Sequence, residues 1–596
     1  MKGNPKRAAA VLAVLLAAVF VCMTLANGIQ TDHGNIRVTD GVMQCAAGEL
    51  TYKLYTPVTA TEENPAPGVL LLHGYQNDHE TCAAYAIELA RRGAVVMALD
   101  EYGHGRSAAG LLERGYVNHK VTVNYGEDSA DAGTYVEVNG AKRYRLMMNF
   151  SNLSFFDGHY TKDDAGNAVS DSSCGGVAAW AALAAMPNVD SSRLAVSGHS
   201  MGTWSSWSVA AAYAGSEIEP RATVLQCGEL FRDSAYDTEK YHFNNVLLLQ
   251  AKWDEFSYFR DYKPVVNDDL LRSDLRTEFL GVGADEARWD TTFGRFEDGS
   301  ARRIELLYTN HRLTTHHDGG LTTALKWFDS TIDLPGSIPD EEHTAIGKEW
   351  LTFAAMLCAV AAMLPVMELL LCLPFFAKAA IPLPPKEGIK TSGKWWKGAA
   401  ITILLSFATY PFMTQLGHGL LPLPENIFRM TVGNGFLSWY LLLILIMLGT
   451  TVVSRAKHKK GLGGSDYYGM GLSCPGAPEK ISLGLLGRSA LLTLGMLLTV
   501  YGLVALCEGL FRLDFRIIWP FFKTFTLPRF GQFWVYIPVF ALFFVLNNSK
   551  IMAGQRTEAT YEPGFRGFLR CWWRYALVMV GGTLLIALIE YVPFFM

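Results

Sequence analysis

The amino-acid sequence predicts an α/β fold with a doubly wound, mostly parallel sheet and a cap insertion, followed by an all-α transmembrane bundle. Short β-branched runs alternate with helix-like stretches over residues 33–335, and long apolar segments follow over residues 348–596. Half of the residues are hydrophobic, yet 18% are charged, as expected when a polar domain is fused to membrane helices. A chain of 596 residues also exceeds the roughly 250–300 residues at which one core stops growing.

The N-terminal segment, residues 1–30, reads as a signal anchor or a signal peptide. A basic cluster over residues 2–7 precedes the nineteen-residue uncharged run Ala8–Ala26. Either interpretation places the following domain on the far side of the membrane. The length of the run favours an anchor.

Residues 33–335 alternate between two kinds of segment. Six apolar runs bounded by Gly, Asn or Asp predict buried parallel strands: Val69–His73, Ala94–Asp100, Leu194–His199, Thr223–Cys227, Val246–Gln250 and Ile304–Thr309. Four stretches between them predict helices: Glu80–Arg91, Gly176–Met186, Met201–Ala214 and Leu321–Ser330. The stretch of about residues 107–171 breaks this rhythm, and an Asn139-Gly140 turn between Val136–Val138 and Tyr144–Leu146 predicts a hairpin inside a cap.

The C-terminal part contains apolar segments of roughly membrane-spanning length by the ~20-residue criterion. There are six of them: 350–376, 398–416, 436–453, 489–510, 533–546 and 575–592, of which 533–546 is the shortest. Three apolar segments also contain a glutamate, namely Glu368, Glu508 and Glu590, for which we expect interfacial placement.

Loop charges predict the orientation of these segments. The stretches 377–397, 455–488 and 547–574 carry five, six and five Lys or Arg, whereas 419–435 carries one. By the positive-inside rule the three basic loops are cytoplasmic, and residues 33–335 are extracytoplasmic in a plasma-membrane protein. The stretch 511–530 departs from the rule, since its four basic residues fall on the outer side.

Composition excludes some classes of protein. The net charge of −5 and the lack of a basic, aromatic-bearing surface segment give no reason to expect a nucleic-acid partner. None of the ten cysteines forms a C-x-x-C pair, so we expect no zinc site. Cys45, Cys82, Cys174 and Cys227 fall in the extracytoplasmic part, as a disulfide-forming set or as buried thiols.

The motif Gly198-His-Ser200-Met-Gly202 follows a predicted strand and precedes a predicted helix. G-x-S-x-G in this setting is a nucleophile elbow, in which glycines allow a tight turn that exposes the serine hydroxyl. The strand Val69–His73 ends in His-Gly, where such enzymes supply an oxyanion-binding amide, here that of Tyr75. The second amide is that of Met201.

Together with these motifs, the stretch Asp100–Ser107 resembles the α/β-hydrolase superfamily, in particular its monoacylglycerol-lipase-like, serine-aminopeptidase-like and dienelactone-hydrolase-like branch. It is similar to the family's D-x-R-G-H-G-x-S, with Tyr102 in place of Arg. The resemblance covers about residues 33–333. It does not reach the C-terminal helices, whose family we do not recognise.

The resemblance implies the catalytic order Ser, acid, His. For the acid, Asp254 follows the strand Val246–Gln250 at the family's position, with Glu255 and Glu229 as alternatives. For the base, three histidines follow the strand Ile304–Thr309, and we rank His311 first, His316 second and His317 third. A metal site at His316-His317-Asp318 is the weaker alternative, since adjacent side chains in extended backbone point apart.

The sequence therefore predicts a membrane-bound, extracytoplasmic serine hydrolase without a cofactor or metal. It would cleave an ester, thioester or amide bond through a Ser-His-Asp triad and an acyl-enzyme, with a lipid or acyl ester as its substrate. The alternatives are an exported peptidase and a non-catalytic hydrolase-like domain that binds a ligand for a transporter. Because a candidate for every catalytic role is present, we favour the enzyme, most specifically an esterase or lipase.

Overall fold

The computed structural model describes residues 4–595 except 46, 109–134, 139–140, 145–159, 163–167, 172, 229, 231–242, 256–264, 387–388, 390, 411, 414–420, 422 and 425–426. Most of the predicted cap lies outside the described residues. Within it, β5 (Tyr135–Val138) and β6 (Ala141–Tyr144) pair antiparallel, in agreement with the predicted hairpin, and β7 (Tyr160–Lys162) pairs with β8 (Ala168–Ser170).

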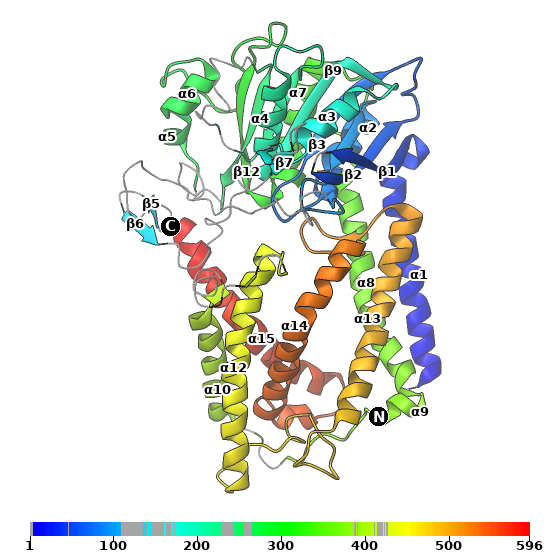
Figure 1. Cartoon of the computed structure of the whole chain (residues 1–596), viewed down its shortest axis with the longest axis vertical. Coiled ribbons are helices and arrows are strands. Elements are labelled where there is room, and N and C mark those ends of the chain that lie inside the picture. The colour runs from blue at the N-terminus through cyan, green and yellow to red at the C-terminus, as the bar shows by residue number, and fades with distance from the viewer. Residues whose placement is uncertain are drawn as a thin grey trace.

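An eight-stranded sheet forms the centre of the α/β domain (Figure 1). Its strands are β1 (Ile36–Cys45), β2 (Gly48–Pro57), β3 (Ala66–Leu72), β4 (Val95–Leu99), β9 (Val189–His199), β10 (Ala222–Gln226), β11 (Val246–Trp253) and β12 (Arg302–Asn310), in the order β1-β2-β4-β3-β9-β10-β11-β12. From β4 onward all neighbours are parallel, and the antiparallel pairs are β1–β2 and β2–β4. With its strand-turn-helix elbow after β9, this is the predicted α/β-hydrolase fold.

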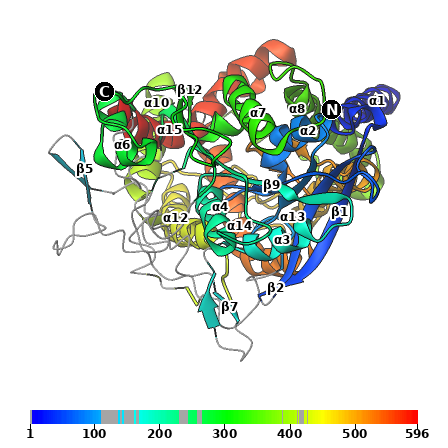
Figure 2. The same cartoon turned by 90° about the horizontal axis from the view of Figure 1, so that it is seen from above.

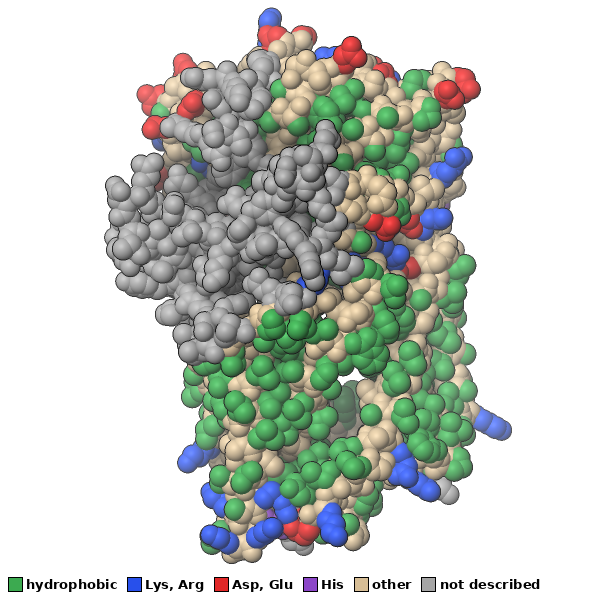
Figure 3. Space-filling view, viewed as in Figure 1, with side chains coloured by type: hydrophobic (Ala, Val, Ile, Leu, Met, Phe, Trp, Pro, Cys, Tyr) green, Lys and Arg blue, Asp and Glu red, His purple; other side chains and the backbone are tan. Residues whose placement is uncertain are grey.

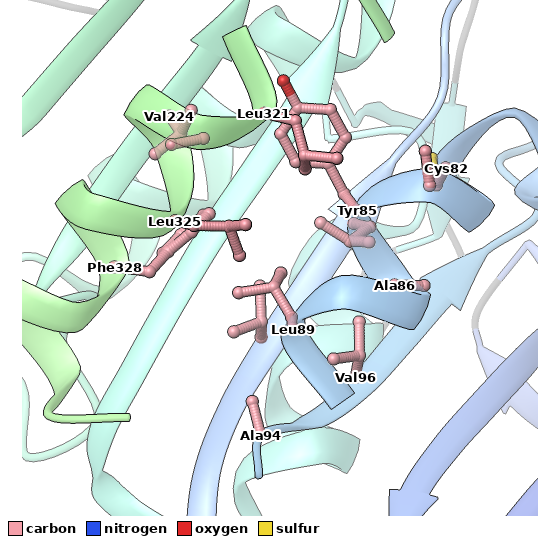
Figure 4. Close-up of a cluster of buried hydrophobic side chains, with 14 of the residues drawn as sticks. Cys82, Tyr85, Ala86, Leu89, Ala94, Val96, Val224, Leu321, Leu325 and Phe328 are labelled. Carbon is pink, nitrogen blue, oxygen red and sulfur yellow. The ribbon is translucent and has the colours of Figure 1, made fainter. Parts of the chain in front are cut away.

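Helices cover both faces of the sheet because strand residues alternate between them. Val69 and Leu71 of β3 face α2 (Ala83–Arg91) and α7 (Asp318–Ile332), in the core drawn in Figure 4. Leu70 and Leu72 face α3 (Gly176–Ala184) and, through Val209, α4 (Met201–Tyr213). Figure 2 shows α4 and α7 on opposite sides of β9. Two short helices, α5 (Asp268–Leu271) and α6 (Asp274–Leu280), precede β12.

The hairpin β1–β2 is the part of the sheet that was not predicted. Its strands alternate buried with partly exposed positions and carry Asp, Lys, Glu and Thr, so they lack the continuous apolar run that identified the other six. An antiparallel hairpin with one solvent-exposed face is harder to recognise in a sequence than buried parallel strands.

Long helices make up the rest of the described chain: α1 (Pro5–Gln30), α8 (Ala345–Leu371), α10 (Ser392–Thr409), α12 (Thr431–Lys459), α13 (Leu483–Phe511), α14 (Leu527–Gly554) and α15 (Gly564–Phe595). Six of them, all but α10, are long and apolar enough to cross a membrane. The segment predicted to be shortest, 533–546, lies within the 28-residue α14. Helix formation thus extends past the apolar run into flanking polar residues.

The long helices associate in two groups (Figure 1). Helix α1 packs along α8 and touches α13, with Val19 and Met23 buried against Ala355, Val504 and their neighbours. Helix α12 packs on α14, and α10 packs on α15. Apolar side chains dominate the visible surface of these helices below the α/β domain (Figure 3), as expected where lipid replaces water.

Candidate active site

Ser200 lies between β9 and α4 in a conformation that few non-glycine residues adopt. Its backbone angles are φ 53° and ψ −113°. A Cβ on Gly198 would stand 2.0 Å from the carbonyl oxygen of Gly202, and one on Gly202 would stand 2.4 Å from that of Leu72. Only glycine therefore fits either position, and the turn presents a partly exposed Ser200 at the end of the sheet.

The loop after β3 runs beside this elbow, as an oxyanion site requires. A Cβ on Gly74 would lie 3.2 Å from Cβ of Ser200, so this glycine allows the close approach. Tyr75 follows and is half-buried, while Met201 begins α4 and is buried. The two predicted oxyanion residues thus belong to separate backbone segments: Met201 directly follows Ser200, and Tyr75 follows Gly74 of the neighbouring loop.

Asp254 and His311 meet at the ends of two neighbouring strands. Asp254 directly follows β11, His311 directly follows β12, and the distance from His311 Nδ1 to Asp254 Oδ1 is 3.1 Å. Both side chains are buried. A carboxylate held against Nδ1 orients the ring, so that Nε2 is the nitrogen left for a substrate proton.

Cys227 also contacts the carboxylate and was not predicted to do so. It follows β10, the strand between those that carry Ser200 and Asp254, and its Sγ donates to Asp254 Oδ2 at 3.4 Å. Its backbone has a positive φ of 51° at the strand end, and its side chain contacts Asp254 from there. The position directly after an inner parallel strand was the available sequence signal, because such positions converge at one edge of the sheet.

The alternative acids have different positions. Glu255 accepts a hydrogen bond from the backbone amide of His311, at 2.8 Å through Oε2, and therefore fixes the loop that carries this histidine. Glu229 lies outside the described residues. Of the glutamates in apolar segments, Glu508 near the end of α13 forms an ion pair with Arg106, whereas the side chain of Glu590 is outside the described part.

The other ranked histidines point elsewhere. His316 is buried, with Nδ1 2.8 Å from Thr315 Oγ1 and Nε2 3.9 Å from a carboxylate oxygen of Glu349 on α8. Burial lowers its pKa, against the opposing effect of Glu349. His317 caps α7 by accepting from the Gly320 amide. With Asp318 paired to His343, the residues 316–318 do not converge on a common point.

The histidines within the motif turns hold backbone. His73 Nε2 accepts from the Glu101 amide at 3.1 Å, and His104 Nδ1 lies 2.8 Å from the Tyr102 carbonyl oxygen. His199 Nε2 lies 2.9 Å from the His311 carbonyl oxygen and so ties the elbow to the loop that carries His311. Burial lowers the pKa of His73, which favours the neutral ring whose Nε2 can accept the hydrogen bond from Glu101.

Within the described residues, two sets of side chains have donor atoms close enough to share a metal ion: Cys227 with Asp254 and His311, and His458 with Asp466 and Glu479. The first set coincides with the acid–histidine pair. The four cysteines of the α/β domain, Cys45, Cys82, Cys174 and Cys227, are free thiols.

Comparison with known proteins gives the following matches. No protein-family model matches the chain, and no curated protein sequence matches it. Among solved structures, an S-formylglutathione hydrolase from Agrobacterium tumefaciens is 16% identical over 50% of this chain and 96% of its own, with a TM-score of 0.27. A dienelactone hydrolase-like promiscuous phosphotriesterase from metagenomic libraries is 17% identical, over 54% and 96% of the two chains, with a TM-score of 0.26. A cold-adapted esterase from an Arctic intertidal metagenomic library is 13% identical, over 50% and 95%, with a TM-score of 0.29.

Proposed function

We propose that this chain is a membrane-bound serine hydrolase that cleaves a carboxylic ester through an acyl-enzyme. The observation that carries the proposal is the juxtaposition at one sheet edge of a strained, partly exposed Ser200 and the buried pair Asp254–His311. A serine at an elbow gains nothing for stability from a positive φ, which costs about 1–3 kcal/mol. Such strain is typical of a residue whose position serves chemistry.

In the proposed reaction, His311 removes the proton from Ser200 as its oxygen attacks the ester carbonyl carbon. The amides of Tyr75 and Met201 hold the resulting oxyanion. When the tetrahedral intermediate collapses, the bond between the acyl carbon and the alcohol oxygen breaks, and His311 gives its proton to the departing oxygen. Water, deprotonated by the same ring, then attacks the acyl carbon. The bond from this carbon to Ser200 Oγ breaks, His311 returns the proton to Oγ, and the acid product leaves.

The proposal places the α/β domain outside the cytoplasm. It is supported by the three basic loops, which join the long helices at the end remote from this domain, where Lys and Arg gather in Figure 3. It is further supported by the packing of α1 along α8 and against α13, which a cleaved signal peptide would not provide. We therefore propose that α1 remains as an anchor.

Labelling and turnover of the purified full chain test the activity. We expect a fluorophosphonate probe to label wild type and short p-nitrophenyl esters to be hydrolysed, whereas Ser200→Ala loses both while remaining folded. Ser208→Ala, a hydroxyl loss on the same helix, is the matched control and should retain both. Undiminished labelling and turnover in Ser200→Ala would refute the assignment.

A further inference from the structure

The segment that joins α13 to α14, residues 512–526, is here called the connector. It links two candidate membrane spans, yet it lies under the α/β domain (Figure 1). Trp519 within it donates from Nε1 to the carbonyl oxygen of Arg312 at 3.2 Å, and its ring centroid lies 6.4 Å from that of His199. His199 precedes Ser200, and Arg312 follows His311. The membrane part therefore reaches the two loops that carry the nucleophile and the base.

Ion pairs hold the connector in this place. Arg516 and Lys523 both bind the buried carboxylate of Asp78, at 3.1 and 2.5 Å, and Arg516 also binds Asp514. Although burial favours the neutral acid, these two cations keep the pKa of Asp78 well below its usual range. Because Asp78 and Arg516 are both buried, this ion pair ties the connector to the α/β domain. The end of the sheet that carries Ser200, Asp254 and His311, here called the catalytic edge, thus faces the membrane helices.

Exposed aromatic side chains mark the level at which the spans begin. Phe522 and Phe525 of the connector are each 44% exposed, and Trp534 in the first turns of α14 is 59% exposed. On the neighbouring span, Trp350 near the start of α8 is 60% exposed. Aromatic rings at helix ends are typical of the membrane–water interface. Trp519, itself half-buried, therefore lies between this interface and the catalytic loops.

This arrangement suits one class of substrate. The ester group of a membrane lipid lies at the interface, with a long acyl chain on one side and a polar head on the other. A water-soluble ester needs no catalytic edge directed at the bilayer. A long acyl chain that enters beside the connector gains about fourfold in affinity for each CH₂ group that it buries against apolar rings. The indole of Trp519 is the apolar ring that the connector places next to the catalytic loops.

We propose that the substrate is a long-chain acyl ester of a bilayer lipid, that it reaches Ser200 from the membrane side, and that Trp519 contacts its acyl chain. This inference rests on the proposed hydrolase function. Trp519 is assigned as a specificity-determining residue, and no proton transfer is attributed to it.

The test compares two substrates on the full chain in lipid nanodiscs: p-nitrophenyl acetate, and a fluorogenic diacylglycerol with long acyl chains in the same bilayer. We expect Trp519→Ala to lower the ratio of long-chain to short-chain kcat/KM by at least about 10-fold, which corresponds to the loss of two or so CH₂ contacts. Trp519→Phe, which keeps an apolar ring but not the Nε1 donor, should restore most of the ratio. Trp534→Ala removes an equally large exposed ring from α14 and should leave the ratio within about twofold of wild type.

The outcomes separate the two proposals. If wild type reacts with a fluorophosphonate and hydrolyses the acetate but not the lipid, the lipid inference is wrong and the hydrolase function stands. Equal losses on both substrates in Trp519→Ala, without rescue by Phe, would show that the indole only supports the loop that carries His311, a result that also overturns the inference. If wild type neither reacts with the probe nor hydrolyses either ester, both proposals fail.

Discussion

At the scale of single residues, His311 and His316 are separated by five positions but belong to different networks. His311 stands against Asp254 at a rigid strand end, whereas His316 is directed toward Glu349 on α8. A general base works only when held within about 2.6–3.2 Å of the proton that it removes. The strand end gives His311 a fixed position beside Asp254, and its role as the general base stays a prediction.

We therefore predict that His311→Ala lowers kcat for short esters by several orders of magnitude and that His316→Ala changes it little. The measurement is steady-state hydrolysis of p-nitrophenyl esters by the two purified variants, each checked for an unchanged thermal transition. A larger loss in His316→Ala would show that the base comes from the 3₁₀ turn over residues 312–316 instead.

Cys227 gives a second residue-scale prediction. Its thiol donates to the oxygen of Asp254 that does not face His311, and so it restrains the carboxylate. We expect Cys227→Ala to lower kcat about 3- to 10-fold, the equivalent of roughly one buried hydrogen bond, while Cys227→Ser keeps a donor and most of the activity. Since both replacements are non-glycine residues, they share the cost of the positive φ at this position. Equal activity of the Ala variant and wild type would contradict the prediction.

At the scale of elements, the connector explains why residues 511–530 depart from the positive-inside pattern. The four basic residues of this stretch are bound to the α/β domain: Arg512 to Asp40, Arg516 and Lys523 to Asp78, and Arg529, in the first turn of α14, to the carbonyl oxygens of Gly103 and Ser107. Basic residues committed to protein partners are consistent with an outer location, since they contribute little free charge at the membrane surface. The loop between two candidate spans is thus a docking element for the α/β domain.

A pH-dependent stability follows from His79 beside this interface. Burial opposes its charge, but Asp100, 2.8 Å from Nδ1, outweighs burial and raises the pKa of His79 to about 9, while Glu80 also favours the charge and Lys53 opposes it. A pKa raised above the unfolded value of about 6.5 stabilises the fold fully below pH ~6.5, and this contribution is lost as pH rises through about 9. The pKa of Asp100 is lowered, so its contribution is constant across that window.

We predict that the free energy of unfolding of wild type exceeds that of His79→Asn by the largest amount near pH 6. This difference should fall by up to about 3 kcal/mol by pH 9. Thermal unfolding of both proteins in the same detergent at pH 6, 7.5 and 9 measures it. His343→Asn, which alters a His–Asp pair remote from the connector, controls for general effects of pH. An advantage that is constant or grows with pH would contradict the assigned charge state.

At the scale of the whole molecule, the α/β domain lies at one end of the long helices and the basic loops lie at the other (Figures 1 and 3). This polarity gives a topology prediction. In intact cells, a thiol reagent that cannot cross membranes should label Asp333→Cys and should not label Lys459→Cys, with the unchanged chain as background. The reverse pattern would place the α/β domain in the cytoplasm and overturn the proposed location.

Short segments of the sequence were sufficient to predict those features of the protein that depend on neighbouring residues alone. Buried parallel strands are continuous apolar runs, an elbow is a five-residue motif, and spans are long apolar segments, so the fold class, the elbow at Ser200 and the helical C-terminal half were all predictable. The position of His311, two residues beyond the predicted strand end at Thr309, also ranked it first among the three histidines.

Only the tertiary structure decided which distant groups meet. The contacts of Cys227 with Asp254, of Glu255 with the His311 amide and of Trp519 with the Arg312 carbonyl join residues 27, 56 and 207 positions apart. Such pairs cannot be predicted from local periodicity, because a charged or aromatic residue in a loop gives the same sequence pattern whether it faces water or a distant partner. The docking of the connector was hidden for the same reason: burial of Arg516 against Asp78 depends on two surfaces meeting, and each surface alone resembles an ordinary polar loop.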